Sequence, residues 1–360
     1  MLFRSCFTKY IDMYIKILEK EIDEFVDTFH RSGLYQNLQD YKYYENIKLN
    51  IVNKGIVNQN IWRSNPCRDG VVDEVISKME IYKNSKTIYI HNKIKDGIIF
   101  CHTGAWDYLW QHFMQDVISM IRQIIKHINN DNMVLLLPFK TDYIDFVITK
   151  ILKISNRIYY VNDNNVQVDK LYIPSFDPQL IFWKGLVPYS YRKEVSMLFN
   201  NYYDSPNNNK LLYLSRRNCG SRKVLNEFEL IDYLKVYCIN NKLEFVDFVH
   251  ENYSNIEDRF AIFNEAKIVI APHGGAIYHI YACKPYTKMI EFVNTKGTPK
   301  CSAIHFAPFI DMDYTILFND GTHSGEGYNI NIKNLDKILK NEDIMYAHQF
   351  NKSDITFTEM

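Results

Sequence analysis

Several features that identify common protein classes are missing from the 360-residue sequence. The sequence contains no run of about 18 apolar residues, the length needed to span a bilayer. Its N-terminus lacks the basic segment, apolar stretch and cleavage site of a signal peptide. The 42 basic and 42 acidic residues cancel, so no overall field favours nucleic acid or an anionic membrane. We expect a cytoplasmic protein without a transmembrane segment that binds no nucleic acid and meets any anionic ligand through a local cluster of cations.

Metal and nucleotide motifs are also scarce. The seven cysteines are odd in number and show neither C-x-x-C pairs nor histidines at zinc spacing, so we expect reduced thiols. The motifs G-x-x-x-x-G-K-[ST] and G-x-G-x-x-G are absent, which excludes the commonest kinases and dehydrogenases, and no G-x-S-x-G elbow supports a hydrolase. Asp311-Met312-Asp313 imitates a D-x-D metal motif, but it directly precedes an expected strand at 314–318. We interpret it as a chance match.

What the sequence does contain is an alternation of short apolar runs with longer helical stretches from residue 86 onward. This alternation is typical of β-α units around parallel sheets. The expected strands of the first half are 87–90, 97–101, 133–137 and 157–161, with helices at 105–128 and 141–154. Those of the second half are 210–215, 243–249, 267–271 and 288–293, with helices at 226–239, at 255–265 and from 275.

The length and the prolines indicate two domains. A chain of 360 residues exceeds the size at which a single core keeps growing. Prolines and the polar run 207–209 predict a linker within 174–209. Two doubly wound halves would place a ligand at the carboxyl ends of their strands, in the crevice between the domains.

The first candidate site is the loop after the strand 210–215, which reads Ser215-Arg216-Arg217-Asn218-Cys219-Gly220-Ser221-Arg222-Lys223. Arginine forks match phosphate oxygens and lysine adds a point charge, so the four cations suit a pyrophosphate. Asn226 and Glu229 predict a capping box that starts the next helix and leaves the cations on the ligand-facing loop. The alternative is a solvated loop with salt bridges.

The second candidate follows the strand 267–271, where Pro272-His273-Gly274-Gly275 leads into the expected helix. Glycines let the backbone approach a ligand closely, and a helix N-terminus presents N–H groups to an anion. His273 could donate to a phosphate or stabilise charge on a leaving nucleotide. A structural histidine is the alternative.

The third candidate lies on the expected helix 105–128, where His112 and Asp116 stand one turn apart beside an apolar stripe. A carboxylate can orient an imidazole or take the proton itself, which is the pairing that a general base needs. A salt-linked pair on an ordinary helix is the alternative.

In their order and spacing these segments resemble glycosyltransferase family 61, which includes plant xylosyl- and arabinosyltransferases and animal protein O-linked N-acetylglucosaminyltransferases. The resemblance spans roughly residues 98–318 and looks especially like the animal branch at 222–226. The family pattern has an H-x-x-x-D helix, S-R-x-R with N-E-x-E-L, H-G-A-G-L-T-N, and an acidic residue that ends the next strand. Those places are filled here by His112 and Asp116, Ser215 to Arg222 with Asn226-Glu227-Phe228-Glu229-Leu230, His273 to His279, and Glu291.

The resemblance implies an α/β protein of the GT-B fold, with two Rossmann-like, doubly wound domains facing a central cleft. Apolar residues at helical spacing among Lys and Glu predict in addition an N-terminal helical extension with an amphipathic helix at 7–29. We expect an acceptor-side domain at 1–185, a nucleotide-sugar domain at 186–325, and a C-terminal helix and tail at 326–360. The implied activity is inverting hexosyl or pentosyl transfer from a UDP-sugar to a glycan or protein hydroxyl, with no metal or other cofactor.

The resemblance also implies roles for single residues. Arg217 and Arg222 would hold the diphosphate with Arg216 as a substitute for Arg217, His273 and the glycine amides would complete the cradle, and Glu291 would contact the ribose. The donor residues are therefore expected to be Ser215, Arg216, Arg217, Arg222, His273, Gly274, Gly275, Ala276 and Glu291. The base would be Asp116, or His112 backed by it. Gly275-Ala276 reverses the family's A-G and His279 replaces its terminal Asn, both expected beside the donor.

Rival interpretations remain open. A catalytically idle nucleotide-sugar-binding or scaffold protein would keep the same fold, and the altered H-G-G-A segment motivates that alternative. A retaining GT-B enzyme would need a donor-side pair of acidic residues in the second half, where only Glu291 is clearly placed. A lectin would need repeated short strands that the sequence lacks. The abundance of Ile, Asn, Lys and Tyr is typical of an A/T-rich genome, and with the expected cytoplasmic location it suggests a giant virus acting in its host's cytoplasm, or a protist-associated microbe.

Overall fold

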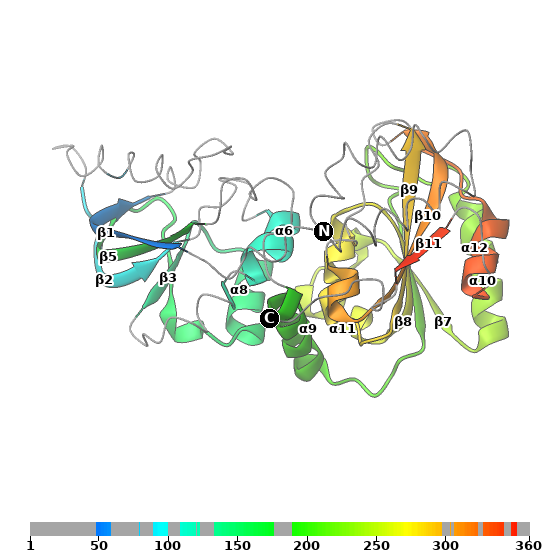
Figure 1. Ribbon diagram of the computed structural model, residues 1–360, viewed down its shortest axis with the longest axis horizontal. Helices are drawn as coiled ribbons and strands as arrows, with labels where there is room; N and C mark the ends of the chain where they lie inside the picture. The colour runs from blue at the N-terminus through cyan, green and yellow to red at the C-terminus, as the bar shows by residue number, and fades with distance from the viewer. Residues whose placement is uncertain are drawn as a thin grey trace, which may run out of the picture. The chain divides into compact units, whose positions relative to one another are not determined.

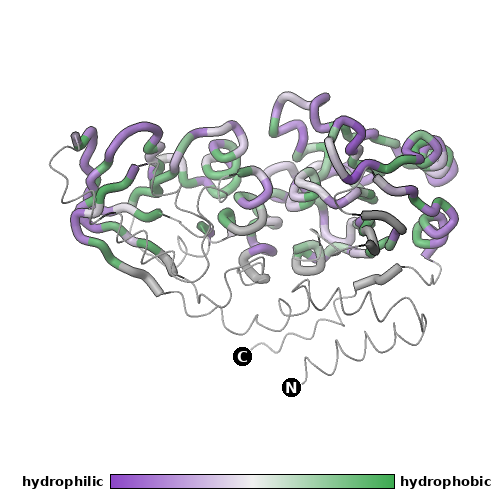
Figure 2. The backbone as a smooth tube through the Cα atoms, turned by 90° about the horizontal axis from the view of Figure 1, so that it is seen from above, coloured by the Kyte–Doolittle hydropathy of each residue, from purple (hydrophilic) through white to green (hydrophobic). Residues whose placement is uncertain are grey.

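The computed structural model describes residues 48–58, 79, 89–99, 109–119, 121–122, 133–175, 189–296, 303, 306–322, 327–341 and 347–350. The chain divides into two compact units, one of residues 40–198 and another that holds residues 199–360 (Figure 1). The domain boundary expected after residue 185 and the helix expected at 7–29 lie outside the described residues. Both units are mixed α/β, and hydrophobic and hydrophilic stretches alternate along their backbones (Figure 2).

The first unit contains a five-stranded sheet with the order β1-β5-β2-β3-β4. β1 pairs antiparallel with β5, and the other neighbours are parallel. The strands are β1 (Lys48–Val57), β2 (Asn92–Ile98), β3 (Val134–Leu137), β4 (Ile158–Tyr160) and β5 (Val166–Ser175). The helical elements are α6 (Trp110–His112), η3 (Phe113–Val117), α8 (Asp142–Phe146), η4 (Val147–Ile151), η5 (Ser155–Arg157) and most of α9 (Tyr189–Tyr203).

The expectations for this unit are corrected in four places. β2 begins five residues before the strand expected at 97–101 and ends at Ile98, and residues 89 and 90 of the strand expected at 87–90 are not in a strand. β1 and β5 were not expected, although the side chains of Val166, Val168, Leu171 and Ile173 on β5 are all buried. α9 occupies part of the expected linker 174–209, and the described part of the expected helix 105–128 contains the π-helical turn η3.

The second unit contains a six-stranded sheet with the order β11-β10-β9-β8-β6-β7, parallel except for β11. Its strands are β6 (Lys210–Leu214), β7 (Glu244–Phe248), β8 (Ala266–Pro272), β9 (Lys288–Lys296), β10 (Asp313–Thr322) and β11 (Ala347–Phe350). Its helical elements are α10 (Glu227–Asn241), η7 (His250–Asn252), α11 (Ile256–Asn264), η8 (Gly275–Ala282), η10 (Ala307–Ile310) and α12 (Ile332–Leu339). The strands expected in this half are confirmed.

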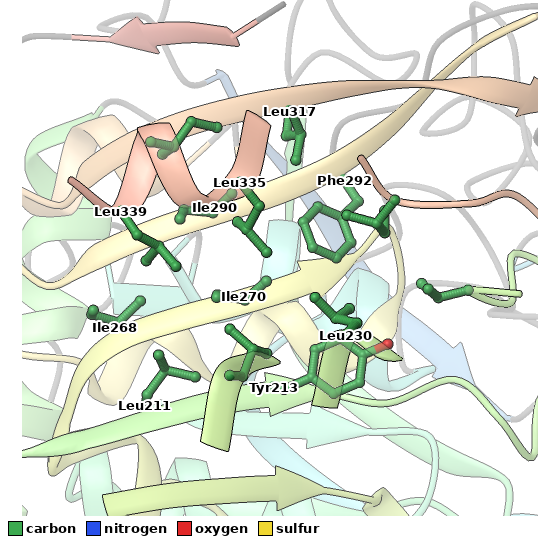
Figure 3. Packing of buried hydrophobic residues seen from close by; sticks show 14 of the residues in the cluster. Leu211, Tyr213, Leu230, Ile268, Ile270, Ile290, Phe292, Leu317, Leu335 and Leu339 are labelled. Carbon is green, nitrogen blue, oxygen red and sulfur yellow. The ribbon is translucent and has the colours of Figure 1, made fainter. Parts of the chain in front are cut away.

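Helices cover both faces of the second sheet, with α10 and α12 on one face and α11 on the other (Figure 1). The α10 and α12 face is closed by a buried cluster that includes Leu211, Ile270, Leu230 and Leu335 (Figure 3). From β6 the chain moves to β7 on one side and then returns to β8 on the other. The sheet therefore changes winding direction between β6 and β8, which is where open α/β sheets bind their ligands.

Candidate functional site

The two anion-binding candidates of the second unit come together at this switch point. β6 and β8 are adjacent parallel strands, with Tyr213 opposite Ile270, so the segments that follow them leave the same edge of the sheet. The Arg216 guanidinium lies against Gly274, where a Cβ atom would stand 2.2 Å from Nη1 of Arg216. The arginine loop and the His-Gly-Gly turn thus form one continuous site.

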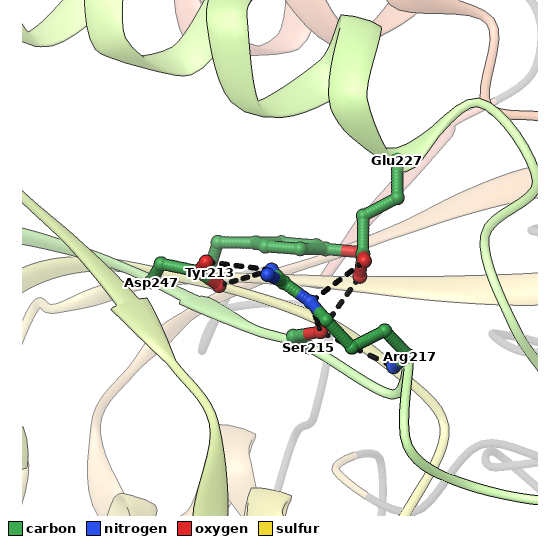
Figure 4. Close-up of polar contacts among 5 residues, drawn as sticks. All are labelled: Tyr213, Ser215, Arg217, Glu227 and Asp247. Carbon is green, nitrogen blue, oxygen red and sulfur yellow. Dashed lines mark hydrogen bonds and ion pairs between the residues drawn. The ribbon is translucent and has the colours of Figure 1, made fainter. Parts of the chain in front are cut away.

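Arg217 is bound by two carboxylates (Figure 4). Its Nη2 donates to both oxygens of Asp247, at 2.7 and 2.6 Å, and its Nε lies 3.0 Å from Oε2 of Glu227. The Ser215 hydroxyl accepts from Nε of Arg217 at 2.9 Å and donates to Oε1 of Glu227 at 2.8 Å, and the Tyr213 hydroxyl donates to the same oxygen at 2.9 Å. Arg217 and Ser215 therefore form a framework beneath the loop.

Arg216 and Arg222 stand in contrast to Arg217. No carboxylate in the described part of the chain pairs with either guanidinium, and Nε of Arg216 donates to the Ser221 carbonyl at 3.3 Å. Burial lowers the pKa of Arg222, and the positive charge of Arg216 lowers it further. An anion bound between these two partly buried cations would relieve their mutual repulsion, so the pair is suited to anion binding.

The Glu291 carboxylate, at the middle of β9, has no exposed surface. Its Oε1 lies 3.2 Å from Nδ1 of His273, and its Oε2 accepts from the Tyr314 hydroxyl at 2.7 Å and from the Ala303 backbone N–H at 3.0 Å. Because Oε2 of Glu291 already accepts two hydrogen bonds, Oε1 is best satisfied by a donor of its own. This favours the His273 tautomer that carries its hydrogen on Nδ1. Glu291 thus orients the imidazole.

The electrostatics of His273 favour its neutral form in the absence of a ligand. Burial lowers the pKa of the imidazole, Glu291 opposes that effect, and the charges of Arg222 and Arg216 lower the pKa further. An anion placed beside the arginines would reverse their effect. Protonation of His273 is therefore coupled to the charge of whatever occupies the site.

The turn after β8 differs in detail from the expected α-helix N-terminus. Gly274 is extended, with φ 172° and ψ 170°, and Gly275 and Ala276 open a 3-10 helix in which the Ile277 N–H donates to the Gly274 carbonyl at 3.1 Å. Residue 274 must be glycine because the Arg216 side chain approaches it closely. The extended backbone alone would accept any residue. The anion-binding character of this edge therefore rests mainly on side-chain charge.

His279 was expected beside the donor, and the structure corrects this. The residue is 1% exposed and its ring contacts Phe248, Phe260 and Phe263. Its Nδ1 lies 2.9 Å from the Ala276 carbonyl, and burial lowers its pKa to about 3. The apolar 3-10 helix turns this side chain into the core, where it is neutral.

The capping box expected at α10 is not formed. Asn226 occupies the N-cap position, but its side chain makes no capping hydrogen bond. Its Oδ1 accepts from the Ile330 N–H at 2.8 Å and its Nδ2 donates to the Ile330 carbonyl at 3.0 Å. The shorter hydrogen bonds of Asn226 thus go to a backbone 104 residues away, and sequence spacing carries no signal for such a contact.

The candidate base residues lie in the other unit. His112 ends α6 and is half-buried, and Asp116 lies in the following π-helical turn η3, where its backbone but not its side chain is described. π-helical turns occur frequently at functional sites. The pairing of the two side chains therefore stays a prediction.

The D-x-D segment lies away from the candidate site. Asp313 begins β10 and is paired in register with Lys288, the first residue of β9, so it sits at the opposite edge of the sheet from the arginine loop. The Asp313 carboxylate lies 3.6 Å from Nζ of Lys288. Among the described residues, no three His, Cys, Asp or Glu side chains gather to hold a metal ion.

Comparison with known proteins identifies the family. The family model described as Glycosyltransferase 61 matches residues 110–290, a span that covers half of the chain and includes both the arginine loop and the His-Gly-Gly turn. No curated protein matches the chain. In the described part of the chain, no helix is long and apolar enough to cross a membrane. The protein belongs to glycosyltransferase family 61.

Proposed function

We propose that the protein transfers a sugar from a nucleoside diphosphate sugar, most simply a UDP-sugar, and that Arg216, Arg222 and His273 hold the diphosphate. The observation that carries this proposal is the meeting of two partly buried arginines that no described carboxylate neutralises. Their position at the switch point of a doubly wound sheet supports it. Arginine forks bind phosphate oxygens bidentately, which suits both halves of a diphosphate.

The proposal distinguishes three roles among the expected donor residues. Arg216, Arg222, His273 and the Gly274 backbone face the anion. Arg217 and Ser215, already bonded to internal partners, position the loop. We assign Glu291 to the orientation of His273, because both of its oxygens are engaged and it has no exposed surface.

The proposed chemistry is an inverting transfer of a hexose or pentose to a hydroxyl of a glycan or protein. Asp116, or His112 backed by it, takes the proton of the acceptor hydroxyl as its oxygen bonds to the anomeric carbon. The bond from that carbon to the diphosphate oxygen breaks from the opposite face. Arg216 and Arg222 stabilise the negative charge that develops on the departing diphosphate, the task that a metal ion performs in many other transferases.

The first test is a thermal-shift screen of the full chain against UDP-, GDP- and dTDP-sugars, since a bound donor raises the unfolding temperature. We expect a shift with UDP-sugars. The donor that binds is then assayed for release of free nucleotide with and without glycan acceptors. Absence of a shift with every nucleotide would sink the proposal.

The base assignment has its own test. Asp116→Asn should retain donor affinity and lose transfer by about 100-fold or more, the usual contribution of a general base. Asp142→Asn, an exposed aspartate of the same unit, is the matched control and should leave transfer unchanged. Undiminished transfer by Asp116→Asn would remove Asp116 from the mechanism.

A catalytically idle donor-binding protein is the second candidate, motivated by the reversed Gly275-Ala276 pair at the mouth of the site. It predicts the same thermal shifts without hydrolysis or transfer. The nucleotide-release assay therefore separates it from the enzyme.

A further inference from the structure

A short segment from the C-terminal part of the chain lies against the arginine loop. This segment, Gly327–Ile330, is called the strap below. Tyr328 forms a parallel bridge with Val224. The Tyr328 N–H donates to the Lys223 carbonyl at 3.0 Å, and its carbonyl accepts from the Leu225 N–H at 2.9 Å. The strap thus joins the loop immediately after Arg222.

The strap is fixed at both ends. Gly327 has φ 140°, and a Cβ there would stand 2.4 Å from the Lys223 carbonyl oxygen, so only glycine fits. At the other end the Asn226 amide makes two hydrogen bonds to the Ile330 backbone. α12 follows directly and packs onto the sheet, with Leu335 in the shared core. The position of Tyr328 is therefore set by backbone contacts on both sides.

The side chain of Tyr328 belongs to the buried cluster on the α10 and α12 face of the sheet, beside the arginine loop. Tyr328 is 3% exposed. Within the described part of the chain, no group forms a hydrogen bond with its hydroxyl. The charges that act on it are those of Glu291, Arg216 and Arg222. Because the hydroxyl oxygen keeps a little exposed surface and has no hydrogen-bond partner in the described part of the chain, it is available as a donor to a ligand.

We propose that the Tyr328 hydroxyl donates a hydrogen bond to the diphosphate held by Arg216 and Arg222, an inference that rests on the proposed function. Burial raises the pKa of this hydroxyl, so it keeps its proton and acts as a donor. The missing partner is then the ligand. The strap lies beyond the residues 110–290 matched by the family model, so this contact is added by the chain outside the matched segment.

The test compares Tyr328→Phe with Tyr237→Phe in the full-length protein, using calorimetric titration with UDP and with inorganic pyrophosphate. Both changes remove one hydroxyl and keep the ring. The Tyr237 hydroxyl donates to the Leu339 carbonyl at 3.3 Å, at the contact of α10 with α12, and is therefore the matched control. Tyr328→Phe should weaken binding of both ligands about tenfold, as expected for loss of a hydrogen bond to a charged group, and Tyr237→Phe should not.

Each outcome separates this inference from the proposed function. If the wild type binds UDP and Tyr328→Phe binds it equally well, the tyrosine contact is overturned and donor binding stands. Binding of pyrophosphate but not UDP, with the tenfold loss in Tyr328→Phe, supports the contact and overturns the nucleotide donor. Binding of neither ligand by the wild type overturns both.

Discussion

The guanidinium of Arg216 lies directly against the Cα atom of Gly274, so closely that a Cβ atom at residue 274 would stand 2.2 Å from Nη1. This contact joins the loop after β6 to the turn after β8. It makes a single site of two segments that are 58 residues apart in the sequence (274 − 216). The geometry of the proposed diphosphate site depends on it.

Gly274→Ala should therefore weaken UDP binding severalfold with little loss of stability. The methyl group would displace the far end of a flexible arginine side chain, which is a small cost in folding but moves a charge that contacts the ligand. The control is Gly220→Ala in the same loop, where a Cβ would meet no atom within 4 Å. Calorimetric titration with UDP and thermal unfolding measure both effects. Equal UDP affinities of the two variants would contradict the contact.

Arg217→Ala should reduce stability, in contrast to substitution of its neighbours. It would leave the Glu227 carboxylate, which is 7% exposed, without its cation, at a cost of about 1–3 kcal/mol in the free energy of unfolding. Arg216→Ala should leave stability unchanged, since no described carboxylate depends on that cation. Urea unfolding of the two variants makes the comparison. Equal losses would show that the two arginines have the same structural role.

The pKa of His273 predicts proton uptake on UDP binding. Burial lowers this pKa in the free protein, and a bound diphosphate would raise it. In the pH window between the two values the complex binds the extra proton, so UDP affinity should fall as pH rises through that window. Calorimetry in two buffers of different ionisation enthalpy measures the uptake. His273→Gln should abolish the part of the proton uptake that is due to His273, and an unchanged uptake would contradict the assignment.

His279 predicts a pH dependence of stability that is independent of the site. Its folded-state pKa of about 3 lies below the unfolded value near 6.5, so the unfolded chain binds more protons between these values. The contribution of neutral His279 to the free energy of unfolding is present above about pH 6.5 and is lost as the pH falls toward 3. His279→Asn should reduce the slope of unfolding free energy against pH by up to about 1.4 kcal/mol per unit in this window.

Urea unfolding at several pH values between 7 and 4 measures that slope. Only the slope is decisive, because the variant also loses packing against Phe248, Phe260 and Phe263 and will be less stable at every pH. A slope identical to that of the wild type would show that His279 does not titrate as inferred.

The strands of the second unit were predictable because buried parallel strands are short apolar runs bounded by polar segments. β8, with six of its seven residues buried, is the clearest example. β1 was not predicted. It pairs antiparallel with β5 and mixes exposed residues such as Ile51 with buried ones such as Val52, so it has no continuous apolar run.

The site was predictable at the level of segments but not of single side chains. Sequence spacing placed the arginine loop and the His-Gly-Gly turn at strand ends, and the structure brings them together. Sequence spacing could not distinguish the roles of Arg216 and Arg217, because only Arg217 is bound by Asp247, which lies 30 residues further along the chain. Tyr328 was not predicted either, because its link to the loop is a backbone bridge across about a hundred residues.

The most direct measurement is the affinity of the full-length protein for UDP and UMP, in the wild type, Arg222→Ala and Lys223→Ala. Lys223 carries the same charge, but the arginine charges that act on His273 are those of Arg222 and Arg216. We predict that the wild type binds UDP at least about tenfold more tightly than UMP, that Arg222→Ala loses most of this preference, and that Lys223→Ala keeps it. Equal affinities for UDP and UMP in the wild type, or a preference that survives in Arg222→Ala, would contradict a diphosphate held at this site.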